Sequence, residues 1–124
     1  KCWMSFNNAG IRTSVFCFST DAEMIEYAAK AGADRVELYT EPLCYGLSQR
    51  TGSGCSSFLS RLPRWPAALG LGLNAGHDLS LVNLNYFYQN IPWLDEVSIG
   101  HALISDALYL GLERTVKEYK NCLR

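Results

Sequence analysis

Two short blocks of the sequence end in the same dipeptide and have the residue types for phosphate chemistry. One block ends in Gly76-His77 and the other in Gly100-His101, and each is an apolar, strand-like run that leads into a helical stretch. A Gly-His pair at the carboxyl end of a strand places a backbone N–H and an imidazole where phosphorylated ligands bind. The imidazole titrates near neutral pH and can transfer a proton there. The two blocks therefore predict a site for a phosphorylated ligand.

Alternating strands and helices are expected to position these residues. The run 11–18 alternates loosely and is rich in β-branched and aromatic residues, which predicts a strand, and further strands are predicted over 35–39, 70–74 and 96–99. Capping residues and apolar periodicity predict three helices between and after them: from the capping box Thr20-Asp21-Ala22-Glu23 to Gly32, from Asp78 or Ser80 to Ile91-Pro92, and from Ser105-Asp106 onward. The last helix is expected to bury four side chains: Leu108, Leu112, Val116 and Tyr119.

This alternation predicts an α/β fold with parallel strands and right-handed crossovers. Four β/α units are compatible with a small doubly wound sheet or with part of a (β/α)8 barrel. Polar residues near the carboxyl ends of three strands, among them Glu37, Asn74 and Ser98, favour the rim of a barrel. A full barrel needs about 250 residues. We therefore expect the 124 residues to form half of one.

Composition excludes several classes of partner. The chain is 48% apolar and 19% charged with a formal net charge of −1, which gives no electrostatic preference for nucleic acid or anionic membranes. No apolar run reaches the roughly 18 residues that span a bilayer, so a cytoplasmic protein is expected. The five cysteines form no CxxC or zinc-binding spacing, so buried or incidental thiols and no metal site are expected. Because Lys1 stands where a start methionine belongs, we expect a piece of a longer protein.

Three blocks of the sequence, Gly32–Thr40, Leu73–Leu79 and Asp95–Ala107, closely resemble the pyridoxine 5'-phosphate synthase family. The blocks stand in the order and spacing of the family, and the resemblance covers most of 9–42 and 67–124. It implies the C-terminal half of a TIM barrel, from strand five onward. The expected organisation is one partial barrel domain over 1–124.

What this resemblance implies is a transferase of vitamin B6 biosynthesis. The family condenses 3-amino-2-oxopropyl phosphate with 1-deoxy-D-xylulose 5-phosphate and releases pyridoxine 5'-phosphate, inorganic phosphate and water. No organic cofactor or metal is expected, the partners are phosphorylated small molecules, and the family assembles as homo-octamers. The first half of the family's barrel carries another catalytic histidine and glutamate, so the isolated chain is expected to have little or no activity.

Five residues match the site of this family. His77 matches its acid/base histidine, and Glu37 matches a carboxylate assigned to transition-state stabilisation. Asp78, through its backbone N–H, matches the site of the aminoketone phosphate together with Gly100 and His101. From the residues alone, a Gly-His pair is also compatible with an ordinary turn, and Glu37 with an inward carboxylate paired to a basic group.

Four other polar residues of the strands have no individual claim to a role and are left outside the predicted catalytic set: Arg35, Tyr39, Asn74 and Ser98. Alternate residues of a strand point to opposite faces, so some of them are expected to face away from the site. Asn74 is compatible with a purely structural hydrogen bond in the loop.

The segment 43–66 departs from the family. It has scattered Gly, Ser and Pro and no apolar period where a barrel needs a crossover helix, and back-translation with a one-base slip restores family-like residues. We interpret it as a frameshifted segment. Two alternatives remain for the whole chain: another phosphate-binding barrel synthase or isomerase, and a non-catalytic half-barrel that binds phosphate.

Overall fold

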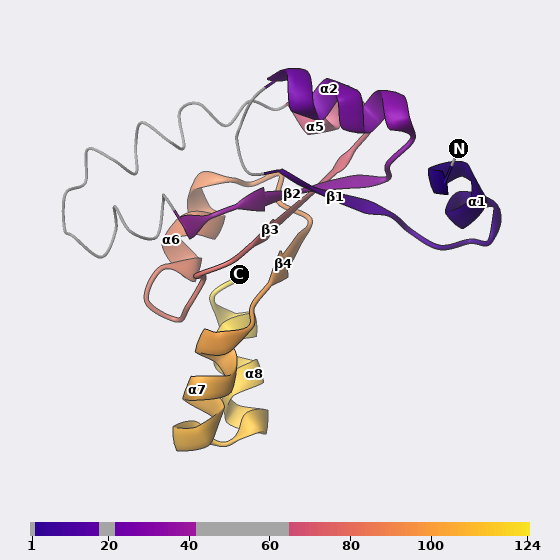
Figure 1. Ribbon diagram of the computed structural model, residues 1–124. Coiled ribbons are helices and arrows are strands. Elements are labelled where there is room, and N and C mark those ends of the chain that lie inside the picture. The colour runs from indigo at the N-terminus through magenta and orange to yellow at the C-terminus, as the bar shows by residue number, and fades with distance from the viewer. Residues whose placement is uncertain (1, 18–21, 42–64) are drawn as a thin grey trace.

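The computed structural model describes residues 2–17, 22–41 and 65–124 (Figure 1). Within these ranges the chain forms one sheet of four strands, all parallel, in the order β1-β2-β3-β4. The strands are β1 (Ser14–Cys17), β2 (Arg35–Tyr39), β3 (Gly72–Gly76) and β4 (Glu96–Ser98). Most of the segment interpreted as frameshifted, residues 43–64, lies outside the described residues.

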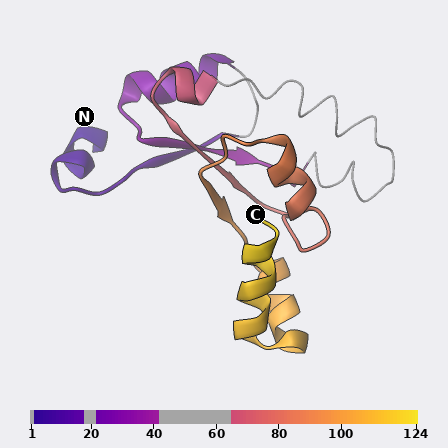
Figure 2. The ribbon, with the colours of Figure 1, turned by 180° about the vertical axis from the view of Figure 1, so that it is seen from behind.

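The helices of the described ranges are α1 (Cys2–Asn8), α2 (Ala22–Ala31), α5 (Trp65–Ala68), α6 (Leu84–Asn90), α7 (His101–Leu110) and α8 (Leu112–Asn121). Helices α2 and α5 lie together on one side of the sheet, whereas α7 and α8 form a hairpin that extends beyond the end of β4 (Figures 1 and 2). Helices α1 and α5 were not predicted from the sequence.

The strand order decides between the two architectures left open by the sequence. In a doubly wound sheet, strands are added first on one side of the starting strand and then on the other. The first strand therefore lies inside the sheet. Here β1 is an edge strand, and each later strand adds on the same side of the one before it. This sequential parallel order is that of a (β/α)8 barrel, which confirms the predicted half-barrel.

The two faces of the sheet differ because successive side chains alternate. Val36 and Leu38 of β2 and Leu73 and Ala75 of β3 are at most 2% exposed and join one apolar cluster with side chains of the helices. Burial of each large apolar side chain contributes about 1.5–3 kcal/mol. The opposite face carries Glu37 and its neighbours in register, and this polar face is the one that bears the candidate site.

Several predicted boundaries are confirmed, and others shift by a few residues. Strand β2 occupies the predicted range, and α2 ends just before Gly32, which takes the left-handed φ of +85° expected of a C-terminal cap. Strand β1 is shorter than 11–18, and β3 begins two residues later than predicted. The predicted capping residues 20 and 21 lie outside the described residues.

The predicted last helix is two helices. Gly111, with φ +81°, separates α7 from α8, and α8 turns back along α7. The stripe predicted for one continuous helix is therefore broken, and the prediction of burial is wrong for Leu108, Leu112 and Val116, which are 81%, 61% and 39% exposed. It is confirmed for Tyr119, which is 4% exposed.

Tyr119 joins the two helices of this hairpin. Its hydroxyl donates a hydrogen bond to Asp106 Oδ2 of α7 at 2.7 Å. Burial raises the pKa of the Tyr119 phenol far above its ordinary value, and the Asp106 carboxylate raises it further. The raised pKa keeps the phenol protonated at neutral pH, so it can donate this hydrogen bond.

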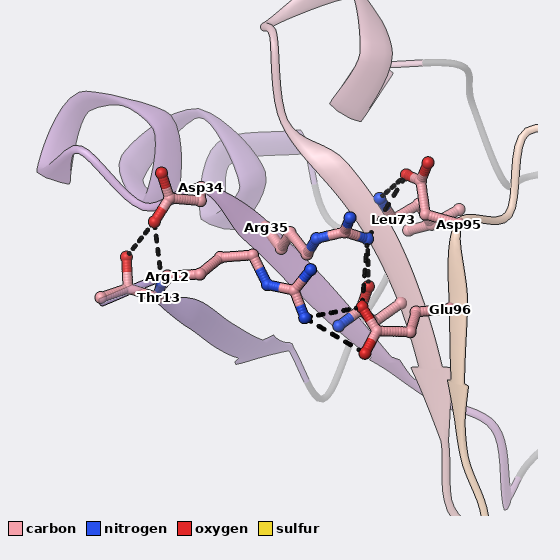
Figure 3. A network of polar contacts seen from close by, with 8 residues as sticks. Arg12, Thr13, Asp34, Arg35, Leu73, Asp95 and Glu96 are labelled. Atoms are coloured by element: carbon pink, nitrogen blue, oxygen red, sulfur yellow. Dashed lines mark hydrogen bonds and ion pairs between the residues drawn. The ribbon is translucent and has the colours of Figure 1, made fainter. Parts of the chain in front are cut away.

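Aspartates tie the amino ends of neighbouring strands together in the same way at two places (Figure 3). Asp34, just before β2, accepts hydrogen bonds from Thr13 N at 2.7 Å and Thr13 Oγ1 at 3.0 Å, just before β1. Asp95, just before β4, accepts a hydrogen bond from Leu73 N of β3 at 2.8 Å. Each carboxylate satisfies a backbone N–H where a strand begins.

Arg35 crosses the polar face at this amino end (Figure 3). Its Nη1 donates to Asn74 Oδ1 at 2.9 Å and lies 3.8 Å from Asp95 Oδ2 and 3.5 Å from Glu96 Oε2. Gly72 leaves room for it, because a Cβ at Gly72 would lie 2.9 Å from Arg35 Cγ. The network lies at the opposite end of the strands from the Gly-His pairs, where a barrel's residues serve stability.

Replacing Asp34 by Asn is expected to cost stability near neutral pH and little in acid. Hydrogen bonds from the Thr13 backbone and side chain, with the charges of Arg12 and Arg35, hold the pKa of Asp34 below its ordinary 3.8. A carboxyl whose pKa is lower in the folded state stabilises above the unfolded pKa, and that contribution is lost as pH falls through the folded pKa.

Urea unfolding of the wild type and of Asp34→Asn at about pH 6 and about pH 2.5 checks this expectation. The difference in free energy of unfolding between the two proteins should be smaller at the lower pH. An equal difference at both pH values would contradict the assigned role of the carboxylate.

Candidate active site

The structure brings four of the five predicted site residues to one cavity. His77 and Asp78 follow β3, Gly100 immediately precedes α7, and His101 is its first residue. These four residues line a cavity of about 210 Å³ together with two apolar neighbours, Leu79 and Ala102. The cavity lies at the carboxyl end of the sheet, where parallel strands of a barrel place their ligands.

The fifth predicted residue, Glu37, lies on the neighbouring strand over the last residue of β3. Glu37 pairs with Asn74 in the β2–β3 register, and its side chain reaches across Gly76. A Cβ on Gly76 would overlap Glu37 Oε1 and would lie 3.2 Å from Ser98 Cβ. The missing side chain at Gly76 therefore makes room for the Glu37 carboxylate over the residue that precedes His77.

The turn that carries the predicted acid/base residue has an unusual backbone. His77 and Asp78 have φ values of +77° and +55°, and they are the non-glycine residues of the described ranges with positive φ. Such conformations are uncommon outside glycine and occur often at functional sites. His77 Nδ1 lies 3.2 Å from Asp78 Oδ1, so a protonated imidazole would form an ion pair with this carboxylate.

The second Gly-His pair forms the start of a helix. Gly100 is the N-cap of α7, and its carbonyl accepts the first helical hydrogen bond, from Ile104 N at 3.2 Å. The first N–H groups of a helix have no carbonyl partner within it, and the helix dipole adds partial positive charge there. His101 and Ala102 therefore bring a favourable environment for an anion to the cavity.

Two residues at the end of β2 contact the His77 turn and were not predicted. The Tyr39 ring meets the His77 ring edge to face, with centroids 4.8 Å apart. The Thr40 hydroxyl donates to the Gly76 carbonyl at 2.9 Å. A signal for Tyr39 was present in the sequence, since strand alternation places it on the face of Glu37. No local signal existed for Thr40.

The expectation that some polar strand residues face away from the site is wrong for the four residues left outside the catalytic set. Arg35 and Tyr39 are two residues either side of Glu37 and share its face. Asn74 and Ser98 lie on that face by register with Glu37 and Gly76. The parallel register aligns all four because residues paired across neighbouring strands point to the same face of the sheet.

A search of the described residues finds no group of three or more His, Cys, Asp or Glu side chains that could hold a metal ion. In the same ranges no helix has the length and apolar character needed to cross a membrane. Cys17 is a buried free thiol and Cys122 a half-buried one, and burial raises the pKa of both. Thiols with raised pKa are poor nucleophiles, which agrees with the expectation of buried or incidental thiols for these two cysteines.

The sequential parallel sheet and the polar cavity at its carboxyl edge define one half of a (β/α)8 barrel protein. The chain belongs to the family described as "Pyridoxal phosphate biosynthesis protein PdxJ", whose model matches residues 1–124. This membership confirms the family predicted from the three sequence blocks.

Curated relatives of the chain carry the name pyridoxine 5'-phosphate synthase. The protein of Bacteroides fragilis (strain YCH46) is 71% identical over 119 residues, which are 96% of this chain and 49% of the relative. The protein of Bacteroides thetaiotaomicron is 69% identical, again over 96% of this chain and 49% of the relative. The protein of Phocaeicola vulgatus is 63% identical over 97% of this chain and 50% of the relative. The chain thus spans about half the length of these relatives.

Proposed function

We propose that this chain supplies the C-terminal half of a pyridoxine 5'-phosphate synthase. The completed enzyme condenses 3-amino-2-oxopropyl phosphate with 1-deoxy-D-xylulose 5-phosphate to form pyridoxine 5'-phosphate, inorganic phosphate and water. The observation that carries the proposal is the shared cavity of His77, Asp78, Gly100 and His101, with Glu37 beside it. The names of the relatives support the same reaction.

In this proposal the aminoketone phosphate binds at the helix start. Backbone N–H groups of Asp78 and of the α7 N-terminus donate to the phosphate, whose charge the helix dipole stabilises. The Asp78 carboxylate would repel a phosphate dianion if it faced it. Its Oδ1 instead lies 3.2 Å from His77 Nδ1, and this contact supports a role for the Asp78 backbone rather than its side chain.

His77 and Glu37 then act on the reacting atoms. The His77 side chain is half exposed at the cavity, where it can donate a proton to a departing phosphate or water oxygen. The Glu37 carboxylate favours a cationic, imine-like intermediate formed between the amine of one substrate and the carbonyl of the other. Tyr39 packs against the His77 ring and restricts its orientation.

The location and assembly are proposed on the family resemblance. We propose a cytoplasmic homo-octamer for the completed protein. Large apolar side chains of the α7–α8 hairpin offer area for subunit contacts, because Leu108, Tyr109 and Leu112 are 81%, 90% and 61% exposed. Contiguous exposed apolar side chains mark sites of protein–protein contact.

A half-barrel complementation experiment tests the proposed function. The half of the Bacteroides fragilis relative that this chain does not match is produced separately, mixed with this chain, and assayed for pyridoxine 5'-phosphate with both substrates. We expect turnover from the mixture and none from either half alone, because the family's site draws catalytic residues from both halves of the barrel.

Two outcomes contradict this proposal. Turnover by the isolated chain at the rate of the intact relative would show that the site does not need the other half. Association of the two halves with phosphate binding but without turnover would instead identify a non-catalytic, phosphate-binding half-barrel.

A further inference from the structure

Two buried polar side chains hold three successive carbonyl groups of the turn after β3. Thr40, at 0% exposure, donates its hydroxyl to Gly76 O at 2.9 Å and also contacts the carbonyl of His77. Asn83, at 8% exposure, donates from Nδ2 to Asp78 O at 3.0 Å. The carbonyls of residues 76 and 77 thus share the single hydroxyl hydrogen of Thr40, and the carbonyl of residue 78 accepts from Asn83.

These contacts also determine where the N–H groups of the turn point. In a trans peptide the carbonyl of one residue and the N–H of the next point in opposite directions within one plane. The described residues contain no cis peptide bond. The N–H groups of His77, Asp78 and Leu79 therefore point away from Thr40 and Asn83, and these three residues line the cavity.

The backbone of the turn needs such support. His77 and Asp78 have left-handed φ values of +77° and +55°, which cost free energy for residues other than glycine. Conformations of this kind persist only where surrounding contacts enforce them. Thr40 comes from the end of β2 and Asn83 from the residue before α6, so the turn is held from two separate elements.

Asn83 is itself positioned by the segment that it supports. Its Oδ1 accepts a hydrogen bond from Ser80 N at 2.8 Å while its Nδ2 donates to Asp78 O. Thr40 is held in the same manner, because its backbone N–H also donates to Gly76 O, at 3.1 Å. Both side chains therefore have little freedom to release the turn.

We propose that Thr40 and Asn83 are positioning residues that hold the His77–Asp78 turn in its left-handed conformation and direct the N–H groups of residues 77–79 at a phosphate in the cavity. The identity of this ligand rests on the proposed function. The conformational role of the two side chains is independent of it.

Matched variants of Thr40 in the full 124-residue chain test the inference by NMR. Thr40→Val removes the hydroxyl at almost constant shape, and Thr40→Ser keeps it. Thr40→Val should shift the amide signals of residues 77–79, speed their hydrogen exchange, and weaken binding of inorganic phosphate about tenfold. Thr40→Ser should keep the wild-type signals and bind phosphate within about twofold of the wild type.

A second variant guards against a folding defect. Amide signals of Val36 and Leu38 report whether the sheet is intact. Asn83→Asp keeps the acceptor for Ser80 N and removes the donor to Asp78 O, so it should disturb the same three amides with Thr40 unchanged. If Thr40→Val loses the amide signals of the sheet, the Asn83→Asp variant is used to test the inference instead.

The outcomes separate this inference from the proposed function. Wild-type amide signals and phosphate affinity in both Thr40→Val and Asn83→Asp would overturn the inference. If the wild-type chain does not bind inorganic phosphate, the proposed phosphate site is wrong. The N–H groups of residues 77–79 then have no role in binding phosphate. The amide signals of Thr40→Val against Thr40→Ser then decide the conformational role alone.

Discussion

Replacing His77 by Asn is expected to lower kcat of the complemented half-barrels by about 10²–10⁴-fold, the usual range for a lost general acid. Asn is the suitable replacement because His77 has a φ of +77°. Asn tolerates this left-handed backbone better than Ala does, so the variant removes the imidazole and leaves the turn in place. The loss should therefore come from proton transfer and not from the fold.

The second histidine of the cavity provides the matched control for His77. His101 begins α7 and is proposed to act through the N–H groups of the helix start. His101→Asn keeps these N–H groups but shortens a side chain that lines the cavity, so we expect a moderately higher KM for the aminoketone phosphate and a much smaller change in kcat. Steady-state kinetics of both variants, with amide signals as a check of folding, separate the two roles. Retention of kcat within about tenfold by His77→Asn would remove the assignment of His77 as the acid.

The second large effect is expected at Glu37. Glu37→Gln keeps the size of the side chain and removes its charge, so a cationic intermediate loses its carboxylate. The loss of one electrostatic partner of this kind typically lowers kcat by about 10²–10³-fold. Rate measurements with the complemented half-barrels check this value. Turnover by Glu37→Gln close to that of the wild type would leave Glu37 as a structural carboxylate of the barrel interior.

Gly76→Ala offers an independent way to displace the same carboxylate. The new methyl group would overlap Glu37 Oε1, which is the far end of a flexible side chain and can move, and it would lie 3.2 Å from Ser98 Cβ, which must give by a few tenths of an ångström. We expect a loss of kcat in the direction of Glu37→Gln with the sheet intact, because small displacements of catalytic groups are costly. Gly72→Ala, on the same strand and face, meets Arg35 instead and should change stability more than turnover.

Local patterns were sufficient for the order and type of most elements. The strand predicted over 35–39 is β2 at its observed bounds, and Gly32 predicted the end of α2. These signals are local, since a strand's two-residue period and a left-handed glycine depend on the chain nearby. The start of β3 was misplaced because the register with β2, which pairs Arg35 with Gly72, involves residues far apart in sequence.

The split of the last helix shows the limit of apolar periodicity. Leu108, Leu112 and Val116 fit one helical stripe in the sequence, yet Gly111 ends α7 and the chain turns back. Glycine in a helix costs about 1 kcal/mol relative to alanine, and contacts between α7 and α8 such as Tyr119 to Asp106 favour the hairpin over a straight helix. The sequence contained the glycine, but not the contacts that make the turn favourable.

The sequence by itself determined the family and the α/β alternation, because motif spacing and the signals for strands and helices are properties of contiguous residues. The resemblance to the family also supplied the five residues proposed for the site. Only the tertiary structure decided which side chains support that site. Thr40 and His77 are 37 positions apart, and the parallel β2–β3 register brings them together. Pairing of distant strands depends on the packing of the whole sheet, and local sequence carries no signal for it.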